Sequence, residues 1–301
     1  MRSPSNSCRR ARPLLGTLVE ISASGAAGEL ATAVDQAFAA IERCHRLMSF
    51  HDAASDVSAL NRDALERPVQ VAAPTWEVLC QAQEIAAASD GAFDVSIAPR
   101  LVQWAYLPAP DRPLPPVKRH GYRAIELAGE GWVRFAEPLW IDLGGIAKGY
   151  AVDCACRVLE RFGIVDYVVN AGGDLRVGHT ATTIHLRLPR RPQLSLSAGT
   201  IRGQAIATSG AYFAAKRGPH GPVHPIVAPA TNGPAAYRGS ISVVADSCML
   251  ADALTKVVAI LGPGAADVLR RFDAQACLLS EDGAFRALGP GTAAAAGLAP
   301  Q

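Results

Sequence analysis

Two segments with apolar residues at helical spacing organise the first third of the chain. In residues 29–48 the apolar positions recur every three or four residues, which predicts an amphipathic helix with one face in the core. The same spacing predicts a second helix over residues 75–88, which Gly91 ends. The segment between them, residues 49–62, is polar, and we expect a turn there.

Short apolar runs bounded by turn residues predict strands through the rest of the chain. The runs are 15–21, 124–127, 132–135, 139–143, 167–170, 183–188, 205–209, 240–244 and 276–279. Helical spacing returns in residues 249–261 and 265–272. Because strands and helices do not alternate regularly, we expect an α+β fold, with a mixed, mainly antiparallel sheet and flanking helices. One compact unit is expected over residues 14–285, with flexible termini at 1–13 and 286–301.

The stretch 141–174, IDLGGIAKGYAVDCACRVLERFGIVDYVVNAGGD, is the segment around which the chain is organised. A strand leads through the glycines at 144–145 into a helix that begins near Lys148 and stops at Gly163. A second strand then runs into the glycines at 172–173. Two glycine turns beside carboxylates, one of them followed by a lysine at a helix start, could cradle a phosphate. The glycines alone favour an ordinary strand–helix–strand unit.

Composition narrows the function classes. The chain has 301 residues, half of them hydrophobic, and a formal net charge of +2, so nothing indicates a nucleic-acid or anionic-membrane partner. The seven cysteines are scattered without a CxxC pair, which fits a reducing compartment better than a disulfide framework or a zinc site. We expect no transmembrane segment and no signal peptide, and hence a cytoplasmic protein.

A series of short motifs, each weak alone, occurs in a distinctive order. The motifs are Leu15-Gly16-Thr17, Met48-Ser49-Phe50, Gly91-Ala92-Phe93-Asp94, DLGGIAKGYAVD, NAGGD, Thr208-Ser209-Gly210, His224 with Pro229, and Ala251-Asp252-Ala253-Leu254. This series resembles the ApbE family, the FAD:protein FMN transferases, over roughly residues 14–261. The resemblance implies a Mg²⁺-dependent enzyme with FAD as its substrate. Such an enzyme joins the FMN half of FAD to a threonine or serine hydroxyl of an acceptor redox protein and releases AMP.

The resemblance also implies the residues of the flavin site. A flavin needs a flat apolar slot with a few hydrogen-bonding groups, and a lysine suits the pyrophosphate. The positions that match are Leu15, Met48, Phe50, Ala92, Phe93, Asp94, Asp142 and Lys148. Without the resemblance, Asp94 is more typical of a turn or helix-cap aspartate.

The metal site implied by the resemblance departs from the family pattern at one position. The pattern supplies the backbone carbonyl of Gly145, the carboxylate of Asp252, and a threonine four residues after that aspartate. Lys256 stands at the threonine position, and Thr255 precedes it. An ammonium only donates hydrogen bonds and cannot ligate a metal. Lys256 could therefore pair with Asp252, contact the pyrophosphate or lie at the surface, and Thr255 could supply the missing oxygen.

His224 matches the family histidine proposed to accept the proton of the acceptor hydroxyl, a step that suits a base titrating near neutrality. Taken alone, a histidine in such a Gly/Pro-rich loop is usually an exposed residue. Its spacing to Pro229 is one residue longer than the usual motif, and Ala228 and Ala211 stand where polar residues are common. Two alternatives therefore stay open: a non-catalytic FAD-binding protein, and a pyrophosphatase that converts FAD into FMN and AMP.

Overall fold

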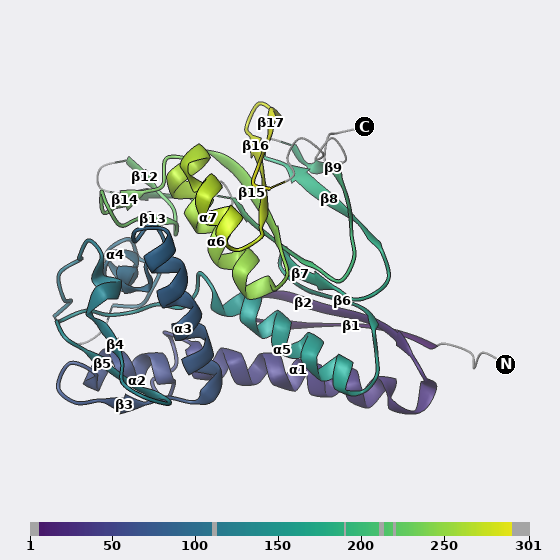
Figure 1. Ribbon diagram of the computed structural model, residues 1–301, viewed down its shortest axis with the longest axis horizontal. Coiled ribbons are helices and arrows are strands. Elements are labelled where there is room, and N and C mark those ends of the chain that lie inside the picture. The colour runs from purple at the N-terminus through teal and green to yellow at the C-terminus, as the bar shows by residue number, and fades with distance from the viewer. Residues whose placement is uncertain (1–5, 110–112, 190, 211–213, 219–220, 291–301) are drawn as a thin grey trace.

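The computed structural model describes residues 6–109, 113–189, 191–210, 214–218 and 221–290, and an eight-stranded sheet lies at its centre (Figure 1). Every neighbouring pair in this sheet is antiparallel, which confirms the α+β prediction. In sheet order the strands are β1 (Asn6–Leu14), β2 (Thr17–Gly25), β6 (Asp166–Ala171), β7 (Asp174–Val177), β10 (Ala205–Gly210), β15 (Gly239–Ala245), β16 (Gln275–Ser280) and β17 (Phe285–Leu288).

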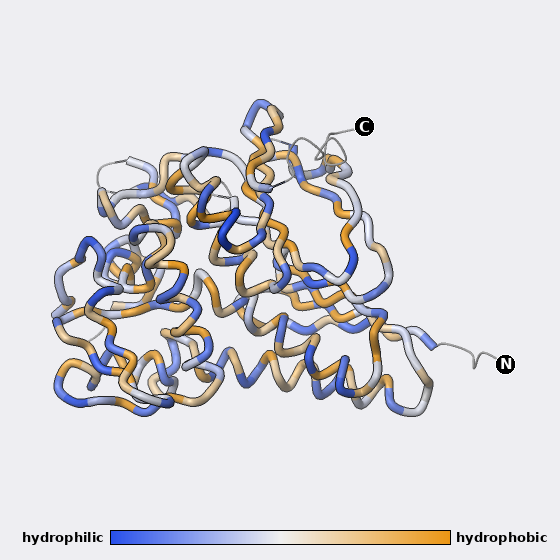
Figure 2. The backbone as a smooth tube through the Cα atoms, viewed as in Figure 1, coloured by the Kyte–Doolittle hydropathy of each residue, from blue (hydrophilic) through white to orange (hydrophobic). Residues whose placement is uncertain are grey.

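Helices α1 (Ala27–Met48), α5 (Ala147–Arg161) and α6 (Cys248–Leu261) cover one face of the sheet. Alternate strand residues point into the core that they enclose, as Val19 and Ile21 do from β2. In Figure 2 the helices and strands at the centre of the molecule carry most of the hydrophobic colour. The helices predicted over residues 29–48, 75–88 and 249–261 are confirmed, because their apolar faces pack in this core.

The hairpin of β8 (Thr182–Leu188) and β9 (Arg191–Ile201) contributes to a smaller apolar cluster on the opposite face of the sheet. The buried residues of that cluster are Val177, Ile184, Leu186, Ala198, Ile201, Ile206 and Cys277. Ile206 lies in this cluster, whereas its neighbours in β10 lie in the main core, as alternation along a strand requires.

A second lobe follows α1 and shares the main core (Figure 1). It holds α2 (Asp56–Asp63), α3 (Ala73–Ala88), η1 (Val95–Ile97), α4 (Ala98–Gln103), η2 (Gly121–Ala124) and a three-stranded sheet of β3 (Val69–Gln70), β5 (Trp132–Phe135) and β4 (Ile125–Leu127). The remaining short elements are β11 (Lys216–Gly218), β12 (Gly221–Val223), β13 (Val227–Ala228), β14 (Gly233–Pro234), η4 (Gly262–Ala265) and α7 (Ala266–Arg271).

The predicted strand over residues 139–143 is wrong, because this extended segment joins no sheet. The side chain of Asn61 takes the place of a neighbouring strand. Its amide accepts from Ile141 N at 2.7 Å and donates to Ile141 O at 2.9 Å. Asp142 N donates to Val95 O at 2.8 Å. Three tertiary hydrogen bonds therefore fix a segment that the apolar pattern assigns to a sheet.

Three other segments are more ordered than the sequence suggests. The polar stretch 49–62 contains the start of α2, whose N-cap Ser55 accepts from Ser58 N at 3.0 Å. Residues 6–13, expected to be flexible, belong to β1, which pairs with β2 along its whole length. Residues 286–288, also expected to be flexible, belong to β17 at the opposite edge of the sheet. Pairing with a neighbouring strand, which no local pattern reveals, orders both ends.

One helical segment in the described part of the chain, Cys248–Arg271, is long and apolar enough to span a membrane by length and composition alone. Of its most apolar window, 61% is buried inside the protein. The segment begins with α6, which packs between α5 and the sheet, so its apolar character is that of a core helix.

Candidate active site

A pocket of about 730 Å³ lies where the second lobe meets the ends of α1, α5 and β10. Its walls come from segments far apart in the chain, including the turn between β1 and β2 and the loop before β13. The structure brings all the predicted flavin-site residues to this pocket. They are Leu15, Met48, Phe50, Ala92, Phe93, Asp94, Asp142 and Lys148.

Apolar side chains form one wall of the pocket. Met48 at the end of α1 and Phe93 in the loop before η1 are both almost fully buried in the core, yet each presents a surface to the pocket. Phe50 packs against Trp140 with its ring centroid 6.4 Å away and the planes tilted by 60°. This wall is suited to a flat aromatic ring system.

Asp94 fixes the shape of the loop that carries Phe93. One carboxylate oxygen accepts from Ser96 N at 2.8 Å and caps η1, and the other accepts from Tyr122 N at 3.2 Å. Burial raises the pKa of Asp94, although these hydrogen bonds oppose the shift. The cap-aspartate interpretation is therefore correct, and Asp94 also lines the pocket.

Asp142 lies across the pocket, half-buried, and accepts from Gly144 N at 3.1 Å. Burial raises its pKa to about 6, with the Gly144 hydrogen bond and the charge of His51 opposing the shift. The ionised carboxylate of Asp142 therefore lowers the free energy of unfolding, as is common for groups that bind a ligand.

We expect Asp142→Asn to stabilise the protein at pH 8 by about 1–2 kcal/mol, since a shift of one unit equals about 1.4 kcal/mol and partial exposure reduces the effect. Because the folded pKa is raised above the unfolded value, the cost is complete above pH 6. It disappears as the pH falls toward 4. Urea unfolding at pH 4 and pH 8 measures this, with the exposed Asp267→Asn as the control. An equal gain at both pH values would contradict the assignment.

The polar end of the pocket depends on a close contact between α5 and α6. A Cβ atom on Gly149 would lie 2.1 Å from the backbone oxygen of Cys248, so only glycine permits this approach. The contact allows Gly149 N to donate to the carboxylate of Asp252 at 3.2 Å. The fully buried Asp252 is thereby placed at the start of α5, beside Lys148.

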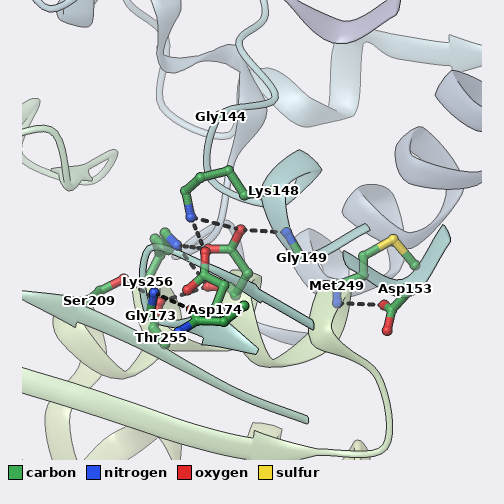
Figure 3. Close-up of polar contacts among 12 residues, drawn as sticks. Gly144, Lys148, Gly149, Asp153, Gly173, Asp174, Ser209, Met249, Thr255 and Lys256 are labelled. Carbon is green, nitrogen blue, oxygen red and sulfur yellow. Dashed lines mark hydrogen bonds and ion pairs between the residues drawn. The ribbon is translucent and has the colours of Figure 1, made fainter. Parts of the chain in front are cut away.

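Four charged residues form a cluster at this end, which we call the charge cluster: Lys148, Asp174, Asp252 and Lys256 (Figure 3). Lys148 Nζ donates to Asp174 Oδ2 and lies 3.5 Å from Asp252 Oδ2. Lys256 Nζ donates to Asp252 Oδ1 and, at 2.9 Å, to the backbone oxygen of the same residue. Both aspartates are buried, and Asp174 lines the pocket together with the two lysines.

At Lys148 and Asp252 the opposite charges outweigh burial, whereas at Asp174 burial and the charge of Asp252 raise the pKa. Burial alone would lower the pKa of Lys148, but the neighbouring carboxylates of Asp174 and Asp252 raise it above its usual range. Burial would likewise raise the pKa of Asp252, but the two lysines lower it. The pocket therefore presents two ammonium groups that are held in place by carboxylates behind them.

The residues expected to hold Mg²⁺ do not fit a metal site. Both carboxylate oxygens of Asp252 already accept hydrogen bonds, from Lys256 on one side and from Gly149 N and Lys148 on the other. Thr255 Oγ1 donates to Asp252 O at 2.7 Å and shares a second hydrogen bond with Ser209 at 2.7 Å. Among the described residues no three His, Cys, Asp or Glu side chains form a group that could hold a metal ion.

Gly145, the expected carbonyl ligand, lines the pocket next to Lys256. A Cβ atom on Gly145 would lie 3.7 Å from Lys256 Cε. The lysine side chain therefore runs from Gly145 to Asp252, between the two residues that were expected to share the cation. Of the three interpretations of Lys256 that the sequence leaves open, pairing with Asp252 is the one that the structure has.

His224 is buried behind the pocket wall, with 9% of its surface exposed, and the wall itself is formed by the next three residues, 225–227. Its Nε2 lies 2.9 Å from the oxygen of Ala235, which can only accept, so Nε2 carries the proton. Its Nδ1 accepts from Ile226 N over a long 3.3 Å. Burial lowers the pKa of His224, which favours the neutral ring. Ala228 lies in β13, and Ala211 falls outside the described residues.

Three important residues were not among the predicted site residues. Asp174 anchors Lys148, and Ser209 carries the hydrogen bond to Thr255; both line the pocket. Asp153 lies away from it and accepts from Cys248 N and Met249 N at the start of α6 and from Arg176. All three residues stand in the motifs quoted above, which was the one available signal for them.

Comparison with known proteins identifies relatives in sequence and in fold. Relatives include an FAD:protein FMN transferase of Vibrio cholerae, 27% identical over 74% of this chain and 71% of its own. One of Salmonella typhimurium is 27% identical over 89% and 83%. Among solved structures, the ApbE protein of Thermotoga maritima superposes with a TM-score of 0.83 at 26% identity, over 96% of this chain and 99% of its own. The flavin transferase ApbE of Vibrio cholerae gives 0.78 at 25% identity, over 94% and 97%.

The model of the ApbE family matches residues 15–279, which include every residue of the pocket described above. This range covers most of the chain and nearly coincides with the single unit expected over residues 14–285. The chain therefore belongs to the ApbE family.

Proposed function

We propose that this protein is an FAD:protein FMN transferase, which joins the FMN half of FAD to a threonine or serine hydroxyl of an acceptor redox protein. The acceptor oxygen attacks the phosphorus of the FMN half. A new P–O bond forms while the pyrophosphate P–O bond breaks, and AMP leaves with the bridging oxygen. The names of the relatives support this assignment, as does membership of the family.

The observation that carries the proposal is the pocket itself, in which an apolar wall and two ammonium groups lie within one cavity of about 730 Å³. The volume is in the range of small-molecule sites. Met48, Phe50 and Phe93 suit the flavin ring, and Lys148 suits the pyrophosphate as a point charge. Phosphoryl transfer is accelerated mainly by positioning and by neutralising charge on the phosphates, and this pocket offers both.

His224 is our candidate for the base that accepts the proton of the acceptor hydroxyl. The hydrogen bond from Nε2 to Ala235 O fixes the tautomer and leaves the lone pair on Nδ1. That lone pair holds only a long hydrogen bond from Ile226 N, which must be released before an acceptor hydroxyl can take its place. Magnesium dependence, which the family resemblance implies, is not part of this proposal, because the oxygens of Asp252 and Thr255 are engaged within the protein.

Product analysis tests the proposal against its two alternatives. The protein is incubated with FAD and a candidate acceptor domain, and the products are examined by mass spectrometry and by chromatography of the nucleotides. We expect one added FMN on the acceptor and one AMP released for each. Free FMN with AMP would indicate a pyrophosphatase instead, and unchanged FAD that stays bound would indicate a flavin carrier. Threonine and serine variants of the acceptor then identify the modified hydroxyl.

A further inference from the structure

The ammonium of Lys256 lies in the charge cluster, at the position where a pyrophosphate ligand needs a positive charge. Its side chain extends from Gly145 to Asp252, and its ammonium makes two hydrogen bonds to Asp252, one to the carboxylate and one to the backbone oxygen. An ammonium has three N–H donors, so one remains for a ligand in the pocket. The side chain of Lys256 is 17% exposed, and it lines the pocket rather than the outer surface.

The carboxylate of Asp252 leaves no oxygen for a second cation, because both of its oxygens accept hydrogen bonds. A magnesium ion binds oxygen ligands at 2.0–2.1 Å in near-octahedral geometry and retains several waters. At Asp252 one carboxylate oxygen already meets the ammonium of Lys256. A divalent ion beside that ammonium would be repelled by several kcal/mol at about 4 Å, even at the effective dielectric near a protein surface. Lys256 and a metal ion therefore compete for the same carboxylate.

Charge counting shows what the cluster offers to a ligand. Lys148 and Lys256 balance Asp174 and Asp252, so the four residues are neutral together. The aspartates are 3% and 0% exposed, whereas the lysines are 34% and 17% exposed, so the positive groups face the pocket. A pyrophosphate diester carries two negative charges, which two ammonium groups can neutralise without a metal.

We propose that Lys256 takes the place of the divalent cation, so that this protein binds the pyrophosphate of FAD with two lysine ammonium groups and without a metal ion. The inference rests on the proposed function, because FAD is its ligand. It deepens that function by assigning the charge neutralisation to a residue of the chain. Lys256 acts here by direct contact with the pyrophosphate, and Asp252 positions it.

Two binding measurements test the inference without relying on activity. Flavin fluorescence gives FAD affinity in EDTA and in Mg²⁺, and electron paramagnetic resonance with Mn²⁺ reports metal binding. For the wild-type protein we expect equal FAD affinity in both buffers and no bound Mn²⁺. Lys256→Thr places a hydroxyl four residues after Asp252, so this variant should bind Mn²⁺. Its FAD affinity should fall at least about tenfold in EDTA and recover in Mg²⁺, the size expected for one charged hydrogen bond.

Lys256→Ala is the matched control, because it removes the ammonium without adding an oxygen ligand. Its FAD affinity should fall in EDTA as that of the threonine variant does, and Mg²⁺ should not restore it. FAD binding by the wild type that rises tenfold or more with Mg²⁺ would overturn this inference and leave the proposed function intact. Absence of FAD binding in both buffers would overturn both. The FAD affinity and Mn²⁺ binding of the wild-type protein test the inference even if a variant fails to fold.

Discussion

Replacing His224 by alanine is expected to lower the rate of FMN transfer by roughly 10²–10⁴-fold, the usual contribution of a general base. FAD affinity should change little, because His224 lies behind the pocket wall and does not line it. The measurement is single-turnover transfer to the acceptor at saturating FAD. Burial lowers the pKa of His224 below its ordinary value of 6.5, and the neutral ring is the base. The transfer rate should therefore fall only when the pH drops through a value below 6.5.

The control for this prediction must separate catalysis from folding, because the ring also holds the backbone of Ala235 and Ile226. A glutamine at position 224 can still donate a hydrogen bond to Ala235 O but cannot accept a proton. His224→Gln should therefore be folded and as slow as the alanine variant. Full transfer by either variant would move the base elsewhere.

The local pattern of the sequence predicts those elements whose apolar residues pack in one layer. Helix α1 buries one face against the sheet, so its periodicity is visible in the sequence, whereas α6 is buried on most sides and stands out as an apolar run. The segment 139–143 has the same apolar character as a strand, but the side chain of Asn61, 80 residues away, satisfies its backbone. A local sequence pattern cannot reveal a hydrogen-bond partner that is so far away in the chain.

The residues that line the pocket could be predicted better than the ion pairs of the charge cluster. All eight expected flavin positions line it, because the resemblance to the family carries each motif to its place. The pairing of Lys148 inside the charge cluster could not be read from the chain. Lys148 meets Asp174 26 residues on and Asp252 104 residues on, and only the α5–α6 contact at Gly149 brings them together. Lys256 lies four residues from Asp252 on the same helix, so their pairing was among the interpretations that the sequence left open.

Asp153 shows the limit of sequence reasoning most clearly. It stands inside the motif DLGGIAKGYAVD, but its partners come from two later elements. The side chain is 3% exposed and accepts from Arg176 Nη1 at 2.8 Å, Cys248 N at 3.0 Å and Met249 N at 2.9 Å. It thereby joins α5, β7 and the first turn of α6, where unpaired backbone N–H groups favour a carboxylate.

Asp153→Ala should therefore lower the free energy of unfolding by about 3–5 kcal/mol, the usual effect of removing one partner of a buried ion pair. The variant leaves the N–H groups of Cys248 and Met249 without an acceptor and the guanidinium of Arg176 without its carboxylate. Urea unfolding followed by circular dichroism measures the loss.

Two controls show whether the loss comes from this junction. Asp153→Asn keeps a carbonyl oxygen for one N–H group and should cost less than the alanine variant. In a double-mutant cycle, Arg176→Met should recover part of the loss, because the uncompensated guanidinium is gone while its alkyl volume is retained. Additive losses, or a loss below about 1 kcal/mol for Asp153→Ala, would contradict the role assigned to Asp153. Because the start of α6 also sets the position of Asp252, the alanine variant should bind FAD more weakly even where it remains folded.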